Sequence, residues 1–199
     1  MNNKDWTGNS RSLFTTNGDS SHSDKEREAN DFYATDPSAT EQLCGLTPLS
    51  EDIWEPACGK GHISKVLEKH GHRVRSTDLI DRGFGQGGVD FLAQREPWGG
   101  DIIVTNPPYK LAMEFARHAL GLLREGNRLC MFLKLTFLEG QKRQSLFRSD
   151  PPKYVYVARS RLDCPLNGEF KPGASSAVCY AWFICEKGWK GDPMVRWFN

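Results

Sequence analysis

The chain of 199 residues, with 38% apolar and 26% charged side chains, has the size and composition of one globular domain. No apolar run approaches the roughly 20 residues needed to span a bilayer, and Met1–Ser10 lacks the layout of a secretory signal. We therefore exclude fibrous, repeat and membrane proteins and expect a cytoplasmic protein.

The net charge of +1 is unevenly distributed along the chain. Residues 1–109 contain 11 Lys and Arg against 17 Asp and Glu, a balance of −6, whereas residues 110–199 contain 15 against 8, a balance of +7. A basic second half suggests an anionic partner such as nucleic acid, although solvated faces of unequal charge explain it equally well. The six cysteines and five histidines have no metal-ligand spacing, so we expect free thiols and no metal.

Residues 1–29 consist mainly of small polar and charged side chains, with Trp6, Leu13 and Phe14 as the large apolar groups. Burying so few apolar groups cannot offset the entropy lost on ordering the segment. We therefore expect a disordered polar tail at 1–29, followed by a single domain at 30–199.

Short apolar runs in the rest of the chain predict seven strands, at 53–55, 73–77, 89–91, 101–105, 129–133, 154–157 and 177–184. The stretches that begin at His62 and Lys110 have apolar residues at helical spacing. Strands alternating with helices predict a doubly wound, Rossmann-like α/β fold with a parallel sheet. The last two strands have no helix between them, so we expect one antiparallel edge strand.

The first predicted strand ends at Glu55 and continues into Pro56, Ala57 and Cys58, followed by a turn with Gly59 and Gly61. Glycines between a strand and a helix allow a ligand to approach the backbone and the free N–H groups of the helix start. The turn has neither the GxGxxG pattern nor a phosphate-binding loop, so a plain tight turn is an alternative.

Two acidic residues follow the next two predicted strands. Asp78 ends the second strand, where a carboxylate can accept both ribose hydroxyls of an adenosine. Asp90 and Phe91 end the third, where they can flank an adenine ring, although a turn-capping Asp and a core Phe are equally compatible. Together with the glycine turn, these acids indicate a nucleoside cofactor.

The fourth predicted strand continues into Asn106, Pro107, Pro108 and Tyr109. The two prolines make this segment stiff and extended. The Asn106 side-chain oxygen and the Pro107 carbonyl can accept the two hydrogens of a primary amine, which directs its lone pair at an electrophile. Tyr109 can stack on the ring that carries the amine. The four residues therefore predict a catalytic site, with a polyproline-like turn as the alternative.

These motifs resemble those of class I S-adenosylmethionine-dependent methyltransferases, above all DNA adenine-N6 methyltransferases with an Asn-Pro-Pro-Tyr motif and small phage and prophage enzymes. Residues 31–37 are similar to the segment that closes over the cofactor in this family. The resemblance implies catalysis by Asn106, Pro107, Pro108 and Tyr109. It implies S-adenosylmethionine binding by Phe32, Tyr33, Thr35, Glu55, Pro56, Ala57, Cys58, Gly59, Gly61, Asp78, Asp90, Phe91 and Asn106.

The same resemblance implies methylation of adenine N6 in DNA, inside a bacterium or a phage-infected cell, with the base rotated out of the duplex. Only 90 residues follow Tyr109, whereas sequence-specific relatives usually carry a substantial recognition region, so we expect short or loose specificity. The candidate substrate-binding residues are Lys134, Arg143, Arg148, Arg161 and Phe170. A solvated surface position is the alternative for each arginine, and a core position for Phe170.

Other substrates present the same NH2 group. RNA base amines and protein glutamine amides are alternatives, although relatives that act on glutamine carry a helical domain for which residues 1–29 are too short and too polar. A non-catalytic relative that binds the cofactor or DNA is a further alternative. The sequence does not indicate an oligomeric state.

Overall fold

The computed structural model describes residues 32–170 and 177–199, so the tail expected at 1–29 lies outside the described residues. Its α-helices are α2 (Pro37–Leu46), α3 (His62–Lys69), α4 (Ala112–Leu122) and α5 (Gln144–Ser149). Its strands are β1 (Asp52–Glu55), β2 (Arg73–Ser76), β3 (Ile102–Thr105), β4 (Arg128–Lys134), β5 (Tyr154–Ala158), β6 (Tyr180–Glu186) and β7 (Met194–Phe198). Single 3-10 turns are η1 (Phe91–Ala93), η2 (Tyr109–Leu111), η3 (Leu135–Leu138) and η4 (Gln141–Arg143).

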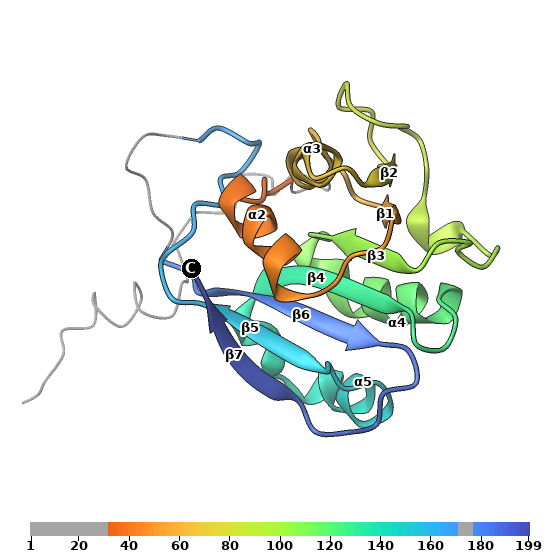
Figure 1. Cartoon of the computed structure of the whole chain (residues 1–199), viewed down its shortest axis with the longest axis vertical. Coiled ribbons are helices and arrows are strands. Elements are labelled where there is room, and N and C mark those ends of the chain that lie inside the picture. Colours follow the sequence, from red (N-terminus) through yellow and green to blue (C-terminus); the bar gives the residue numbers. More distant parts are fainter. Residues whose placement is uncertain (1–31, 171–176) are drawn as a thin grey trace, which may run out of the picture.

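The seven strands form one sheet in the order β2-β1-β3-β4-β6-β5-β7 (Figure 1). The first four strands of this order are parallel, and β6 runs antiparallel to both β4 and β5. The predicted fold class, a seven-stranded and mostly parallel α/β sheet, is therefore confirmed. The reversed strand β6 lies inside the sheet instead of at its edge, because it pairs with both β4 and β5, and β7 pairs in parallel on the far side of β5.

The strand predicted at 89–91 is wrong. Asp90 instead caps η1, because its Oδ1 atom accepts a hydrogen bond from the Leu92 N–H at 2.9 Å. A short acidic side chain that binds a nearby backbone N–H favours such a turn over a strand. The sheet still has seven strands, because it contains β7, which the sequence analysis did not identify.

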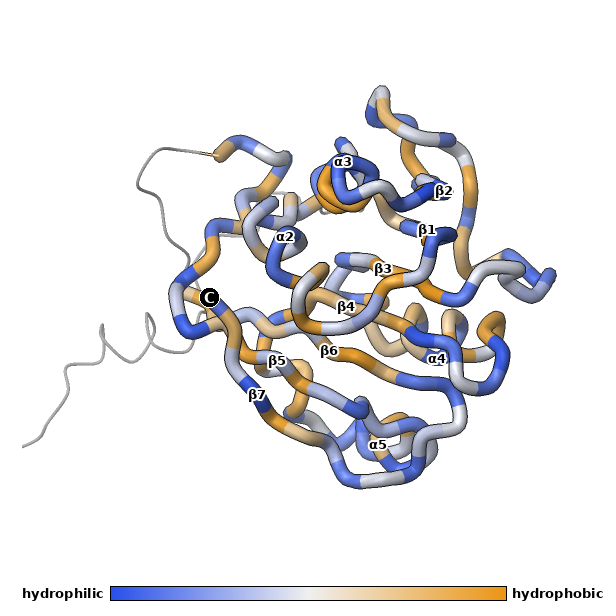
Figure 2. Tube along the Cα trace, in the orientation of Figure 1, coloured by the Kyte–Doolittle hydropathy of each residue, from blue (hydrophilic) through white to orange (hydrophobic). Residues whose placement is uncertain are grey.

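Helices cover both faces of the sheet. Within β3, the Ile103 side chain belongs to the apolar cluster that contains α4 and α5 residues, whereas Ile102 and Val104 face α2 and α3. This alternation is the ordinary consequence of a strand buried on both faces. Figure 2 shows hydrophobic segments along β3, β4 and β6, with polar segments mainly in the surrounding loops. Within the described ranges, no helix has both the length and the hydrophobicity to cross a membrane.

The carboxyl ends of the parallel strands meet at one edge, where this architecture usually places its ligands. A short segment, residues 32–35, which we call the strap, crosses this edge. It is joined to a later loop by an isolated bridge between Tyr33 and Leu166 and by a 2.8 Å hydrogen bond from the Asn167 N–H to the Phe32 carbonyl. The strap therefore lies against the strand ends where the sequence predicts the site.

Candidate active site

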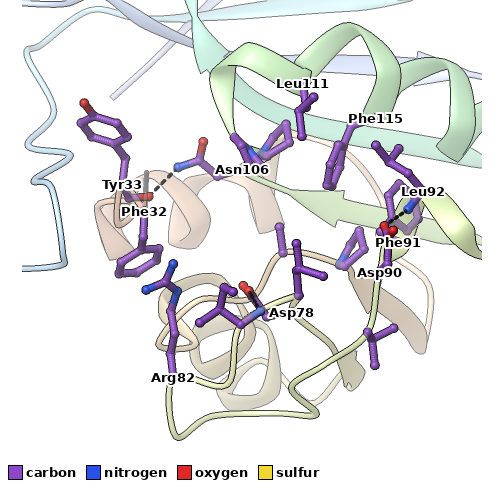
Figure 3. A pocket seen from close by; sticks show the side chains of 17 residues that line it. Phe32, Tyr33, Asp78, Arg82, Asp90, Phe91, Leu92, Asn106, Leu111 and Phe115 are labelled. Atoms are coloured by element: carbon purple, nitrogen blue, oxygen red, sulfur yellow. Dashed lines mark hydrogen bonds between the residues drawn. The ribbon is translucent and has the colours of Figure 1, made fainter. Parts of the chain in front are cut away.

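A pocket of about 180 Å³ lies at the carboxyl ends of β1, β2 and β3 (Figure 3). Its walls are formed by Phe32, Tyr33, Pro56, Ala57, Asp78, Leu79, Ile80, Arg82, Val89, Asp90, Phe91, Leu92, Asn106, Pro107, Pro108, Leu111 and Phe115.

The pocket brings together most of the residues predicted to hold a cofactor. The predicted residues that line it are Phe32, Tyr33, Pro56, Ala57, Asp78, Asp90, Phe91 and Asn106. The predicted residues outside its lining are Thr35, Glu55, Cys58, Gly59 and Gly61. In the second group, Thr35 contacts Asn106, and the other four residues lie at the end of β1 or in the turn between β1 and α3.

Glu55 lies beneath the first turn with 2% of its surface exposed. Its carboxylate accepts hydrogen bonds from the backbone N–H of Ser64, at 2.8 Å, and from the Ser64 hydroxyl. Burial raises the pKa of Glu55 to about 8, and the hydrogen bonds from Ser64 act in the opposite direction. Because Ser64 lies in the first turn of α3, Glu55 fixes the helix that follows the glycine turn.

Both glycines of the turn have positive φ, 56° at Gly59 and 79° at Gly61. A Cβ at Gly59 would collide with the ring of Phe32, and a Cβ at Gly61 with the ring of Phe84. The sequence predicts that a ligand approaches the backbone at these glycines. In the structure, the rings of Phe32 and Phe84 occupy that space instead. Cys58 is buried, with its Sγ atom 3.5 Å from the Phe84 carbonyl oxygen.

Asp78 joins the first turn to the loop after β2. Its Oδ2 atom accepts a hydrogen bond from the Gly59 N–H at 2.8 Å, and its Oδ1 atom accepts one from the Ile80 N–H at 2.9 Å. Each carboxylate oxygen can accept a second hydrogen bond. Asp78 can therefore hold the two turns together and still accept the hydroxyls of a sugar in the pocket.

The sequence analysis allowed Asp90 and Phe91 either to contact an adenine ring or to serve as a turn cap and a core residue, and the structure is compatible with both roles. Asp90 caps η1 and Phe91 is 2% exposed, with ring centroids 5.2 Å from Trp54 and 4.9 Å from Phe115. Both residues nevertheless line the pocket (Figure 3). This wall therefore offers a carboxylate beside an apolar surface, which suits a flat base with an amine.

The Asn106 carboxamide has its two ends in different environments. Its Nδ2 group donates to the Tyr33 carbonyl (Figure 3) and to the Thr35 hydroxyl, both at 3.0 Å. Its Oδ1 atom is buried and has no hydrogen-bond partner among the described residues. Buried polar atoms are rarely left unpaired. The arrangement therefore provides an unused acceptor in a side chain that lines the pocket.

Tyr109 follows the prolines and begins η2. Its ring centroid lies 5.2 Å from that of Tyr33, and its hydroxyl donates to the Tyr180 hydroxyl at 3.4 Å. Burial raises the pKa of Tyr109 well above its usual value. The Lys134 ammonium lies 4.8 Å from the centroid of the Tyr109 ring. Of the predicted substrate residues, Lys134 is thus brought directly to the Asn-Pro-Pro-Tyr segment.

The other predicted substrate residues are placed differently. Arg143 is tied into its own loop, because its Nη1 atom donates to the Thr136 carbonyl at 3.3 Å and to the Glu139 carbonyl. Arg148 and Arg161 are exposed. Phe170 is 39% exposed and its ring centroid is 5.5 Å from that of His62, so the core alternative is wrong.

Several pocket residues were not predicted from the sequence: Leu79, Ile80, Arg82, Val89, Leu92, Leu111 and Phe115. Leu79 and Ile80 directly follow Asp78, so their position at a strand end was an available signal. Leu111 and Phe115 lie four residues apart at the start of α4, which also indicates a shared face. No local sequence pattern indicates Arg82 as a pocket residue. Its position depends on how the loop after β2 folds, which brings its guanidinium to 5.0 Å from the Phe32 ring centroid.

All six cysteines lie in the described part of the chain, and each is a free thiol. Among residues 32–170 and 177–199, no group of three or more His, Cys, Asp or Glu side chains could hold a metal ion.

No protein-family model and no curated protein matches the chain. Solved structures do match. A predicted O-methyltransferase from Agrobacterium tumefaciens, Atu636, has a TM-score of 0.58 at 14% identity, over 81% of this chain and 85% of that protein. The type IIG restriction endonuclease BpuSI has a TM-score of 0.59 at 13% identity, over 83% of this chain but 27% of that protein.

A third similar structure is the 1,6-didemethyltoxoflavin-N1-methyltransferase of Burkholderia thailandensis, solved with bound S-adenosylhomocysteine. Its TM-score is 0.51 at 12% identity, over 76% of each chain. The chain has the class I methyltransferase fold. Because identities this low establish the fold alone, the reaction has to be argued from the residues of the pocket. In this methyltransferase fold, the pocket and the Asn-Pro-Pro-Tyr segment share the edge formed by the carboxyl ends of the parallel strands.

Proposed function

We propose that the protein transfers a methyl group from S-adenosylmethionine to the N6 amine of adenine in DNA. The observation that carries this proposal is the Asn106 carboxamide, whose two hydrogens are held by the strap while its buried oxygen has no partner among the described residues. An acceptor fixed in this way in a side chain that lines the pocket suits one hydrogen of a substrate amine.

The pocket residues fit S-adenosylmethionine, which supplies a methyl group on a positively charged sulfur. Asp78 would accept the ribose hydroxyls, because its oxygens keep free acceptor capacity beyond their bonds to Gly59 and Ile80. Asp90 would accept from the adenine amine, with Phe91 among the apolar residues that surround the ring. All the side chains that these roles require belong to the described residues.

Asn106 and Pro107 would hold the target amine. The Asn106 Oδ1 atom and the Pro107 carbonyl each accept one amine hydrogen, which withdraws the nitrogen lone pair from the ring and exposes it to the donor. Since the nitrogen can lose its proton after the new bond forms, no strong base is required. The contribution of the chain is orientation, which is a large part of many enzymatic accelerations.

Four observations support DNA as the substrate. The Asn-Pro-Pro-Tyr motif resembles that of DNA adenine methyltransferases, and residues 110–199 carry a balance of +7 charges. Lys134 places a cation beside Tyr109, where it can meet a phosphate or a base. In addition, the fold is shared with a restriction endonuclease.

The test is to incubate the purified protein with methyl-labelled S-adenosylmethionine and separate samples of DNA, RNA and protein, and then to digest each product. We expect label in N6-methyladenine from DNA. Asn106→Ala should remove the label while calorimetry shows retained cofactor binding. Asn127→Ala is the matched control, because this amide binds the Gly100 carbonyl and is outside the pocket lining.

Each alternative substrate gives a different result. Label confined to RNA nucleosides or to glutamine would replace the DNA proposal by one of the alternatives. Cofactor binding without label in any sample would contradict methyl transfer to these substrates and favour a non-catalytic relative.

A further inference from the structure

Thr35 is directed at the catalytic segment and not at the pocket. The residue is 3% exposed, it is outside the pocket lining, and its Oγ1 atom accepts the 3.0 Å hydrogen bond from Asn106. Although the sequence suggests a cofactor contact for Thr35, the contact that its side chain makes is with the carboxamide next to the prolines.

The two strap acceptors determine which way the Asn106 carboxamide faces. Nδ2 has two hydrogens, and Tyr33 and Thr35 each provide one acceptor at 3.0 Å. In the flipped orientation, Oδ1 would face the lone pairs of the Tyr33 carbonyl, which is unfavourable. The strap therefore leaves Oδ1 available as the acceptor that the proposed reaction needs.

The strap is itself fixed by bonds within the chain. Within the strap, directly before Thr35, the Ala34 N–H donates to the Pro165 carbonyl at 3.1 Å. Directly after the strap, Asp36 caps α2, because its Oδ1 atom accepts from the Ser38 N–H at 2.9 Å. Thr35 is thus held between a backbone bridge and a helix start, so its hydroxyl has a defined place before any ligand binds.

We infer that Thr35 is a positioning residue, which acts through Asn106 by fixing the orientation of its carboxamide. This inference rests on the proposed function, because Asn106 is the residue that would touch the substrate. It differs from a cofactor contact in its consequence, since loss of the hydroxyl should slow turnover without weakening cofactor binding.

Thr35→Val tests the inference, because valine keeps the branched shape and removes the hydroxyl. Loss of one hydrogen bond of this kind predicts a kcat lower by about tenfold, with the KM for DNA and the Kd for the cofactor within about twofold of wild type. Thr35→Ser restores the hydroxyl and should recover kcat to within about twofold. Thr40→Val is the matched control, since Thr40 is fully buried in α2 and its Oγ1 atom has no partner among the described residues.

A second measurement follows the Asn106 side-chain NH2 group by nuclear magnetic resonance. Thr35→Val should shift these resonances and speed their exchange with water, while Thr40→Val should not. An unchanged kcat in Thr35→Val, or a raised cofactor Kd with unchanged kcat, would overturn the inference. If the wild type methylates no substrate, the proposed function fails, whereas unaltered Asn106 NH2 resonances in Thr35→Val would refute the positioning role independently of activity.

Discussion

The buried carboxyl of Glu55 should make the stability of the fold depend on pH. Glu55 is 2% exposed, and burial raises its pKa from 4.5 to about 8. The folded protein therefore keeps this proton over a pH range in which the unfolded chain has lost it. Because the folded state binds more protons, the free energy of unfolding falls as the pH rises from 4.5 towards 8.

The size of the effect follows from the two pKa values. Each unit of pKa difference corresponds to about 1.4 kcal/mol, so this single group should reduce the free energy of unfolding by about 4 kcal/mol between pH 5 and pH 9. For a domain of this size, such a change corresponds to a fall of about 10 °C in Tm. Glu55→Gln removes the titrating group and keeps an oxygen that can accept from the Ser64 N–H.

The assay is thermal unfolding of wild type, Glu55→Gln and Glu114→Gln at a series of pH values from 5 to 9. We expect Glu55→Gln to match wild type at pH 5 and to exceed its Tm at pH 9. Glu114 is an exposed residue of α4 and is not among the groups that raise the pKa of Glu55, so Glu114→Gln should follow the wild-type curve throughout. Parallel curves for wild type and Glu55→Gln across the range would refute a raised pKa at this position.

Three further predictions concern single residues. Asp78→Ala should raise the Kd for S-adenosylmethionine at least tenfold in calorimetry, and an unchanged Kd would count against its contact with the ribose. Tyr109→Ala should abolish methylation, whereas Tyr109→Phe, which keeps the ring, should retain most of it; equal rates would contradict a stacking role. Gly61→Ala should lower the free energy of unfolding by about 1 to 3 kcal/mol, because its φ is 79° and a Cβ would meet the Phe84 ring. Gly45→Ala, in a helix with nothing within 4 Å of a Cβ, should instead raise it by about 0.5 to 1 kcal/mol, and a denaturant titration that shows equal effects would contradict this.

The buried strands could be predicted from the sequence because burial leaves a continuous apolar run. The predicted strands at 101–105 and 129–133 correspond to β3 and β4, whose central residues are fully covered on both faces. The edge strand β7 was missed because three of its five residues are exposed, so its apolar pattern is weak. The turn at Asp90 was wrongly predicted as a strand because the Asp90 side chain, and not a neighbouring strand, accepts the hydrogen bond from the Leu92 N–H.

The position of the site could be predicted, but most of its contacts could not. Parallel strands bring their carboxyl ends together, so Asp78 and Asn106 were expected to meet at one edge. The bond between Thr35 and Asn106 joins positions 71 residues apart, and the path of the strap across the edge determines it. The ring of Phe84 at Gly61 likewise depends on the folding of the loop after β2.

Each polar side chain of the site uses some of its atoms for hydrogen bonds within the chain and leaves other acceptor atoms for a ligand. Asp78 uses its carboxylate to join two turns, Asp90 uses Oδ1 to cap η1, and Asn106 uses Nδ2 to bind the strap. Because these bonds are internal to the chain, the remaining acceptor atoms are already oriented and binding requires little further ordering. The same bonds make the proposed chemistry sensitive to distant positions. Removal of the Thr35 hydroxyl from the strap should therefore lower turnover in a protein that still folds and still binds S-adenosylmethionine.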